Sequence, residues 1–163
     1  MKASFRKVGK KDLERLREIV DDPEVSHYLC LIPPVKMKST IEFYDLVRRQ
    51  KDHWHAAVVD GKIAGSIWLH GMNSAGKQAH VTEFGISIAK EYQGMGVGDA
   101  CMKYMISLAR KLKYKRIYLT VVAGNKPAMK LYRKYSFRKE GTQKKAFKIN
   151  GRYQDTIMMA RLI

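Results

Sequence analysis

A cluster of glycines at Gln93–Gly98, with the sequence QGMGVG, is the segment whose residue types most clearly suggest chemistry. It follows a run of strand-forming residues and is followed at once by a pattern typical of a helix. Unpaired backbone N–H groups at a helix N-terminus, together with the helix dipole, bind anions. Glycines let an anion approach the backbone closely because they carry no side chain. The segment therefore predicts a site for a phosphorylated ligand.

Three cofactor-binding patterns use such a turn, and two of them do not match this chain. A P-loop needs G-x-x-x-x-G-K-[ST], but Gly98 is followed by the pair DA. The dinucleotide pattern G-x-G-x-x-G fails in both registers, because its third glycine would fall at Asp99 or Cys101. The third pattern, Q/R-x-x-G-x-G/A, is matched by Gln93, Gly96 and Gly98.

A second segment, GNKPAMKLYRKYSF at residues 124–137, points the same way. It is similar to N-x-x-A-x-x-L-Y-x-K-x-G-F, and with the glycine turn it makes the chain resemble the GNAT superfamily of N-acetyltransferases from about Trp54 onward. The ending EGTQKKAFKINGRYQDTIMMARL resembles the branch that acetylates amino acids, peptide N-termini or ribosomal proteins. Two positions depart from the family pattern: Ser136 replaces the usual glycine, and Asp99 places an acid beside the predicted phosphate site.

The resemblance implies acetyl-CoA as co-substrate and a primary amine as acceptor, with direct attack of the amine in a ternary complex and no metal. The acceptor would be an amino acid, another small amine, or the N-terminus of a peptide or protein. In this family the glycine turn binds the pyrophosphate and the preceding strand binds the pantetheine arm through its main chain. The predicted cofactor-binding residues are Phe84, Gly85, Ile86, Ser87, Ile88, Gln93, Gly94, Met95, Gly96, Val97, Gly98, Asn125, Lys126 and Ala128.

Two further residues are candidates for catalysis. A lysine-like ammonium, with a pKa of about 10.4, is almost fully protonated at pH 7, so the reaction needs a proton acceptor. Glu83 precedes the glycine turn among apolar neighbours and is the candidate base, directly or through water; the alternative is a strand glutamate that is exposed or pairs with a lysine. Tyr132 matches the family tyrosine that donates to the departing thiolate, and the alternative is a packed aromatic residue of an amphipathic helix.

The elements that must position these residues follow from hydrophobic periodicity and turn signals. Asp60-Gly61 and Asn150-Gly151 are typical of tight hairpin turns. Residues 81–122 form a strand–helix–strand unit, which favours a parallel strand pair. The predicted strands are Ser4–Val8, Trp54–Val59, Ile63–Leu69, His80–Ala89, Arg116–Val122, Phe137–Ile149 and Tyr153–Leu162. The predicted helices are Lys11–Val20, a helix capped by Ser39 or Thr40 and ending at Arg49, Val97–Leu112, and a helix capped by Asn125 and ending near Tyr135.

We therefore expect one domain over residues 1–163 of the α/β class, with an α+β mixed sheet. A GNAT-like sheet of about seven mostly antiparallel strands would contain one parallel pair splayed around the cofactor, with about four flanking helices. Residues 1–53 would form the acceptor side, and residues 54–163 the acetyl-CoA-binding core.

Composition adds one open alternative. The 163 residues include 32 Lys or Arg against 15 Asp or Glu, a formal net charge of +17. This charge fits either a solvated surface or a polyanionic partner, so a basic nucleic-acid- or ribosome-binding module without catalysis is the alternative function. No apolar run is long enough to span a membrane and the N-terminus has no signal-peptide core, so we expect a cytoplasmic protein without a membrane partner. The family resemblance leaves a homodimer open.

Other polar residues give weaker signals. Cys30 and Cys101 lack metal-ligand spacing and are expected to be free thiols. His53 and His55 would share one face of a strand, but no third ligand follows from the spacing, so no metal site is expected. The acidic residues that would hold a cationic acceptor are not ranked by the sequence; they are Glu24, Glu42, Asp45 and Asp155.

Overall fold

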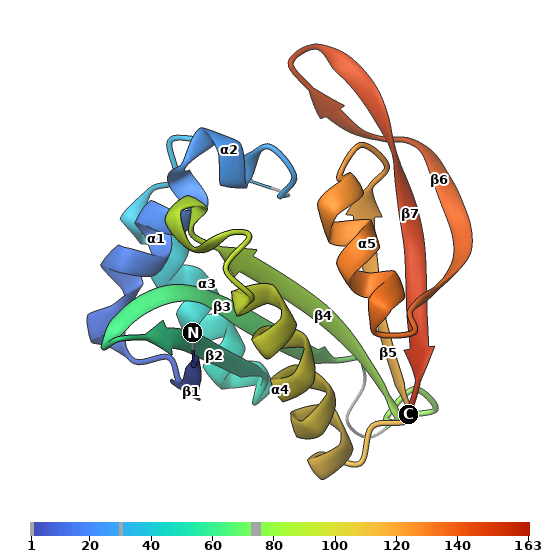
Figure 1. Cartoon of the computed structure of the whole chain (residues 1–163), viewed down its shortest axis with the longest axis horizontal. Coiled ribbons are helices and arrows are strands. Elements are labelled where there is room, and N and C mark those ends of the chain that lie inside the picture. Colours follow the sequence, from blue (N-terminus) through green and yellow to red (C-terminus); the bar gives the residue numbers. More distant parts are fainter. Residues whose placement is uncertain (1, 30, 73–75) are drawn as a thin grey trace. The chain divides into compact units, whose positions relative to one another are not determined.

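A computed structural model describes residues 2–29, 31–72 and 76–163 of the chain (Figure 1). Seven strands form one mixed sheet in the order β1-β2-β3-β4-β5-β7-β6, and β4 and β5 are parallel, as predicted. The strands are β1 (Ser4–Lys7), β2 (His53–Val59), β3 (Lys62–Gly71), β4 (Val81–Ile88), β5 (Arg116–Val122), β6 (Arg138–Ile149) and β7 (Arg152–Leu162). The helices are α1 (Leu13–Asp21), α2 (Pro23–Ser26), α3 (Met37–Gln50), α4 (Val97–Lys111) and α5 (Lys126–Lys134), with 3-10 turns η1 (Lys10–Asp12) and η2 (Lys90–Tyr92).

Five α-helices lie in the described part of the chain, close to the predicted number of about four, and one of them is the single turn α2, which Asp22 caps by accepting the N–H of Glu24. The predicted cap of the helix that precedes β2 is wrong. Helix α3 begins at Met37, so Ser39 and Thr40 lie inside it and cannot cap it. The earlier start places Met37 against the hydrophobic core around α1.

The hairpin turns have the backbone conformation that their sequences predict. Asp60 and Gly61 have φ angles of 47° and 77°, and Asn150 and Gly151 have φ angles of 48° and 77°. Both pairs therefore lie in the left-handed region that a type I′ turn requires. These turns join β2 to β3 and β6 to β7 in antiparallel register.

The chain forms two compact units, Met1–His70 with Phe84–Leu108 and Gly71–Glu83 with Ala109–Ile163. In the first unit, neighbouring residues of β2 face opposite sides of the sheet, as the period of a strand requires. Trp54 packs edge-on against Phe43 of α3, with ring centroids 4.9 Å apart. His55 contacts Tyr104 of α4, so α3 and α4 cover opposite faces of β2 (Figure 1).

The second unit contains the parallel pairing and the C-terminal strands. Val81–Glu83 of β4 pair with Arg116–Tyr118 of β5, and β5 continues along β7 in antiparallel register. Helix α5 ends in a Schellman motif, in which the N–H of Phe137 bonds the carbonyl of Tyr132 at 3.0 Å and the N–H of Ser136 bonds that of Arg133 at 2.9 Å. The residue that such a motif places in the left-handed region is Ser136, whose φ angle is 62°.

Candidate active site

The glycine turn joins the end of β4, through η2, to the start of α4. Gly94 and Gly96 have φ angles of 73° and 83°, and an added Cβ at either position would meet nothing within 4 Å. Glycine is therefore favoured at both positions by the positive φ angle, and not by lack of space for a side chain. The turn is exposed from Gln93 to Gly96, while Val97 is buried and anchors the helix start.

The first turn of α4 carries amide groups that a helix cannot pair internally. The first helical bond described there runs from the N–H of Ala100 to the carbonyl of Gly96, at 3.1 Å. Asp99 lies in this turn, where the helix dipole stabilises a carboxylate. The side chain of Gln93 donates to the carbonyl of Ile88 at 3.1 Å, so the turn is tied to the end of the strand.

The strand residues Phe84–Ile88 lie in the same unit as this turn. Phe84 is buried, and the hydroxyl of Ser87 lies 3.2 Å from that of Ser66 on β3. A Cβ added to Gly85 would approach the ring of Trp68 to 3.3 Å, so this glycine leaves room for an indole side chain. The register of β4 with β5 ends at Glu83, before these residues.

Glu83 lies opposite Tyr118 in the parallel pairing of the second unit. The phenol of Tyr118 donates to the Glu83 carboxylate at 3.3 Å and also lies 2.9 Å from the sulfur of Met72. Burial, followed by the nearby charge of Glu83, raises the pKa of Tyr118 to about 12. The sequence analysis missed Tyr118, because the register of a parallel pair cannot be taken from one sequence.

Helix α5 carries the remaining predicted site residues. The side chain of Asn125 accepts the N–H of Ala128 at 3.2 Å, which confirms the predicted cap, and Lys126 is exposed in the first turn. Tyr132 is buried, and its ring lies 6.0 Å from that of Phe137. Burial raises the pKa of Tyr132 to about 12, so the phenol keeps its proton at neutral pH.

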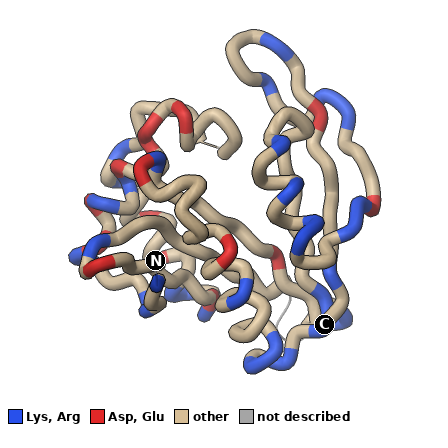
Figure 2. The backbone as a smooth tube through the Cα atoms, in the orientation of Figure 1, with Lys and Arg blue, Asp and Glu red and all other residues tan. Residues whose placement is uncertain are grey.

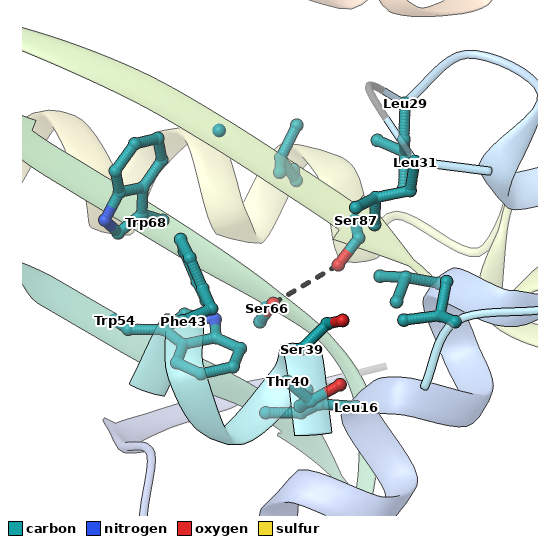
Figure 3. Close-up of a pocket in the computed structure, with 14 residues that line it drawn as sticks. Leu16, Leu29, Leu31, Ser39, Thr40, Phe43, Trp54, Ser66, Trp68 and Ser87 are labelled. Atoms are coloured by element: carbon teal, nitrogen blue, oxygen red, sulfur yellow. Dashed lines mark hydrogen bonds between the residues drawn. The ribbon is translucent and has the colours of Figure 1, made fainter. Parts of the chain in front are cut away.

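An apolar cavity of about 320 Å³ lies in the first unit and was missed by the sequence analysis (Figure 3). Figure 3 shows Phe43, Trp54 and Trp68 together on one side of it, with Leu29 and Leu31 near the other. Gly85, Ile86 and Ser87 of β4 also line this cavity. The cavity therefore borders the strand segment that was predicted to bind the cofactor.

The acidic residues considered for a cationic acceptor lie elsewhere. Glu24 pairs with Lys90, and Asp155 pairs with Lys144 at 2.8 Å. Glu42 and Asp45 are exposed on α3 and line a separate hollow of mixed charge together with Arg48 and Arg49. None of the four belongs to the described lining of the apolar cavity.

Neither a cluster of metal-ligating side chains nor a membrane-spanning helix is found among the described residues. Residues 2–29, 31–72 and 76–163 contain no group of three or more His, Cys, Asp or Glu that could hold a metal ion, and no helix among them is long and apolar enough to cross a membrane. His55 is instead buried, with its Nδ1 atom 2.7 Å from the hydroxyl of Tyr104. Cys101 is a buried free thiol, and Cys30 lies outside the described residues.

The basic side chains are distributed along the whole chain and do not form a single tail. Figure 2 shows Lys and Arg on α1 and α3 in the first unit and on α5, β6 and β7 in the second. On α5, the side chains of Lys126, Lys130, Arg133 and Lys134 are exposed.

Comparison with known proteins assigns the family. The sequence pattern of the acetyltransferase (GNAT) family matches residues 13–137, so the chain belongs to this family and to the class of N-acetyltransferases, as predicted. The chain is 34% identical to the L-amino acid N-acetyltransferase AaaT of Escherichia coli K12 over 159 residues, covering 97% of this chain and 96% of that protein. It is 29% identical to the spermidine N(1)-acetyltransferase of the same strain over 157 residues, covering 95% and 83%.

A solved structure shows the same fold. The spermidine N-acetyltransferase of Vibrio cholerae, crystallised with CoA and spermine, matches with a TM-score of 0.88 and 25% identity, covering 98% of this chain and 95% of that one. The predicted GNAT-like fold is thereby confirmed.

Proposed function

We propose that this protein transfers the acetyl group of acetyl-CoA to a primary amine, by direct attack of the amine on the thioester within a ternary complex. Family membership and the named activities of the relatives support this proposal, and the V. cholerae relative was crystallised with CoA. The cytoplasmic location, a homodimer and a ribosomal or nucleic-acid partner stay predictions of the sequence.

The geometry of the glycine turn is the observation that carries the proposal. Two glycines with positive φ precede a 15-residue helix, and the turn is exposed. The amides of Gln93–Gly98 would bind the pyrophosphate, where the helix dipole adds about half a positive charge. The main chain of Phe84–Ile88 would bind the amide groups of the pantetheine arm. In the second unit, Asn125, Lys126 and Ala128 at the start of α5 would contact the cofactor.

Glu83 and Tyr132 would then carry the proton transfers. Glu83, with Tyr118 donating to its carboxylate, would accept the proton of the amine directly or through water. As nitrogen attacks the acetyl carbon, the carbon–sulfur bond breaks and the electron pair leaves on sulfur. Tyr132 would stabilise this thiolate by donating a hydrogen bond from its protonated phenol.

Calorimetric titration with acetyl-CoA tests the cofactor site. We expect saturable binding by the wild-type protein and at least tenfold weaker binding by Gly96→Ala. A side chain at φ of 83° costs roughly 1–2 kcal/mol, so the turn would adopt another conformation and misdirect its amides.

The hairpin glycine Gly61 provides a matched control in the same unit. It has a φ angle of 77° and open space around an added Cβ, so Gly61→Ala carries a similar backbone cost. This variant should bind acetyl-CoA like the wild type. Absence of any binding by the wild-type protein, or equal weakening in both variants, would contradict the proposed cofactor site.

A further inference from the structure

We infer that the apolar cavity holds the side chain of the acceptor, which makes the acceptor an α-amino acid, free or at a peptide N-terminus, with an aromatic or long aliphatic side chain. This inference rests on the proposed function and specifies its substrate. Gly85, Ile86 and Ser87 line the cavity and belong to the strand segment proposed to bind the pantetheine arm. An amine whose side chain occupies the cavity would therefore lie beside the strand that carries the thioester.

The residues that line the cavity favour an apolar side chain on the acceptor. The aromatic side is formed by Phe43, which lies edge-on to both Trp54 and Trp68, with ring centroids 4.9 Å and 5.5 Å away. The leucines, isoleucine and valines of the lining are Leu16, Leu29, Leu31, Ile86, Val20 and Val35. Burying apolar area against such a surface is favourable, at about 25 cal/mol per Å².

The few polar groups of the cavity are uncharged. The polar side-chain groups are the hydroxyls of the serines and the threonine and the indole N–H groups of the two tryptophans. The hydroxyls of Ser66 and Ser87 lie 3.2 Å apart, within hydrogen-bonding distance of each other. No charged side chain is found among the residues described in the lining. A polyamine would have to place a second ammonium in this cavity without a carboxylate partner, and burial of an unpaired charge is strongly unfavourable. The cavity therefore disfavours spermidine-like acceptors.

The volume of the cavity limits the size of the acceptor side chain that it can hold. A cavity of about 150 Å³ lined by Leu, Ile and Phe is large enough for benzene. The volume of about 320 Å³ here accommodates the side chain of phenylalanine, leucine or methionine. A glycine or alanine acceptor would leave most of this apolar surface uncovered.

An acceptor panel and a fluorescence titration test the inference together. The panel contains phenylalanine, leucine, methionine, glycine, glutamate, lysine and spermidine, and a peptide with N-terminal phenylalanine, with release of the CoA thiol as readout. Three or more additional buried carbons are expected to raise kcat/KM for leucine over glycine by at least about 30-fold. The free amino acid and the peptide distinguish the two sources of the same acceptor chemistry.

The chain has two tryptophans, and both line the cavity, so their fluorescence reports its occupancy separately from catalysis. We expect phenylalanine to change this emission saturably in the presence of CoA. Leu31→Glu places a carboxylate in the lining at a side chain that is 41% exposed, and should weaken phenylalanine binding at least tenfold. The neighbouring Ile32, which is 90% exposed and outside the lining, gives the control variant Ile32→Glu, with unchanged binding.

The outcomes separate the inference from the proposed function. Faster acetylation of spermidine or lysine than of phenylalanine, or equal effects of Leu31→Glu and Ile32→Glu, would overturn the inference and leave the acetyltransferase function intact. Acetyl transfer to none of the panel, with intact fluorescence binding, would instead contradict the proposed function.

Discussion

Replacement of Tyr132 by phenylalanine tests whether its phenol takes part in the reaction. The change removes one hydroxyl and keeps the ring, which packs against Phe137 in the Schellman motif. A hydrogen bond to a charged group contributes about 1.5–3 kcal/mol. If this bond forms to the thiolate only as the carbon–sulfur bond breaks, its loss lowers kcat by about 10- to 150-fold. The affinity for acetyl-CoA should change by less than about twofold, since the ground-state thioester carries no such charge.

The pKa of Tyr132 refines the expected role. Burial raises it to about 12. A thiol has a pKa of about 8.5, so complete transfer of the phenolic proton to a thiolate is uphill by about 5 kcal/mol. Tyr132 is therefore expected to stabilise the thiolate as a hydrogen-bond donor without ionising. It follows that the loss in kcat should have the same size at pH 7 and at pH 9.

Steady-state release of CoA thiol at saturating acetyl-CoA measures kcat, and calorimetry measures the affinity. Tyr135→Phe is the matched control, because Tyr135 is the half-buried C-cap residue of the same helix and has no proposed catalytic role. Thermal unfolding of both variants checks that each is folded. An unchanged kcat in Tyr132→Phe, or the same loss in both variants, would refute the donor role.

Three further predictions concern the proposed base, the helix end and a buried histidine. Glu83→Gln should slow the acetylation of a lysine side chain by about 100-fold or more. The loss should be smaller for an α-amine, because its pKa is only about 7.7–8.0. Values of kcat/KM at pH 7 for both acceptors measure this difference, and equal losses would mean that another group is the base. Ser136→Gly should stabilise the fold by up to about 1 kcal/mol in urea unfolding, because the position has a φ angle of 62°. Burial lowers the pKa of His55 to about 4 from its ordinary 6.5, so the unfolded chain binds the proton more tightly. The free energy of unfolding should therefore fall as the pH decreases from above 6.5 toward 4, by about 2 kcal/mol between pH 7 and pH 5. In urea titrations His55→Gln should lack this contribution, while His53, whose pKa burial also lowers, keeps a contribution of the same sign.

Local sequence signals were sufficient for most of the fold. The strand Arg116–Val122 has its predicted bounds, and the other strands differ by a few residues at their ends. Both hairpin turns were predictable because Asp-Gly and Asn-Gly favour the left-handed backbone that type I′ turns need. The parallel pair followed from the helix between its strands. The start of α3 was not predictable in this way, because contact of Met37 with the core outweighed the capping preference of Ser39.

Ser136 stands where the family pattern has glycine, and its backbone conformation explains why glycine is usual there. The family glycine at this position corresponds to the left-handed residue of a Schellman motif, and the following Phe137 packs on Tyr132. Serine keeps the motif and its hydrogen bonds, at the expense of an unfavourable φ angle. The sequence alone showed a departure from the pattern, whereas the backbone shows that Ser136 lies in the left-handed region with both hydrogen bonds of the motif formed. We therefore expect the departure to affect stability and not the position of Tyr132.

The apolar cavity depends on a single extra residue in β3 that no periodicity indicated. The register of β2 with β3 shifts between Ala57 and Val58, so that Trp54 pairs with Trp68. Next to the turn, Val59 pairs with Lys62 and Val58 with Ile63, and continuing this register along the strands would place Trp54 opposite Ile67. Because side chains alternate between the two faces of a sheet, the two indoles would then lie on opposite faces. A glycine inside a strand can mark such a bulge, and Gly65 lies at this one, where an added Cβ would come within 2.3 Å of the Ser87 carbonyl. The bulge therefore places both tryptophans on the α3 face, and the proposed acceptor specificity follows from that register.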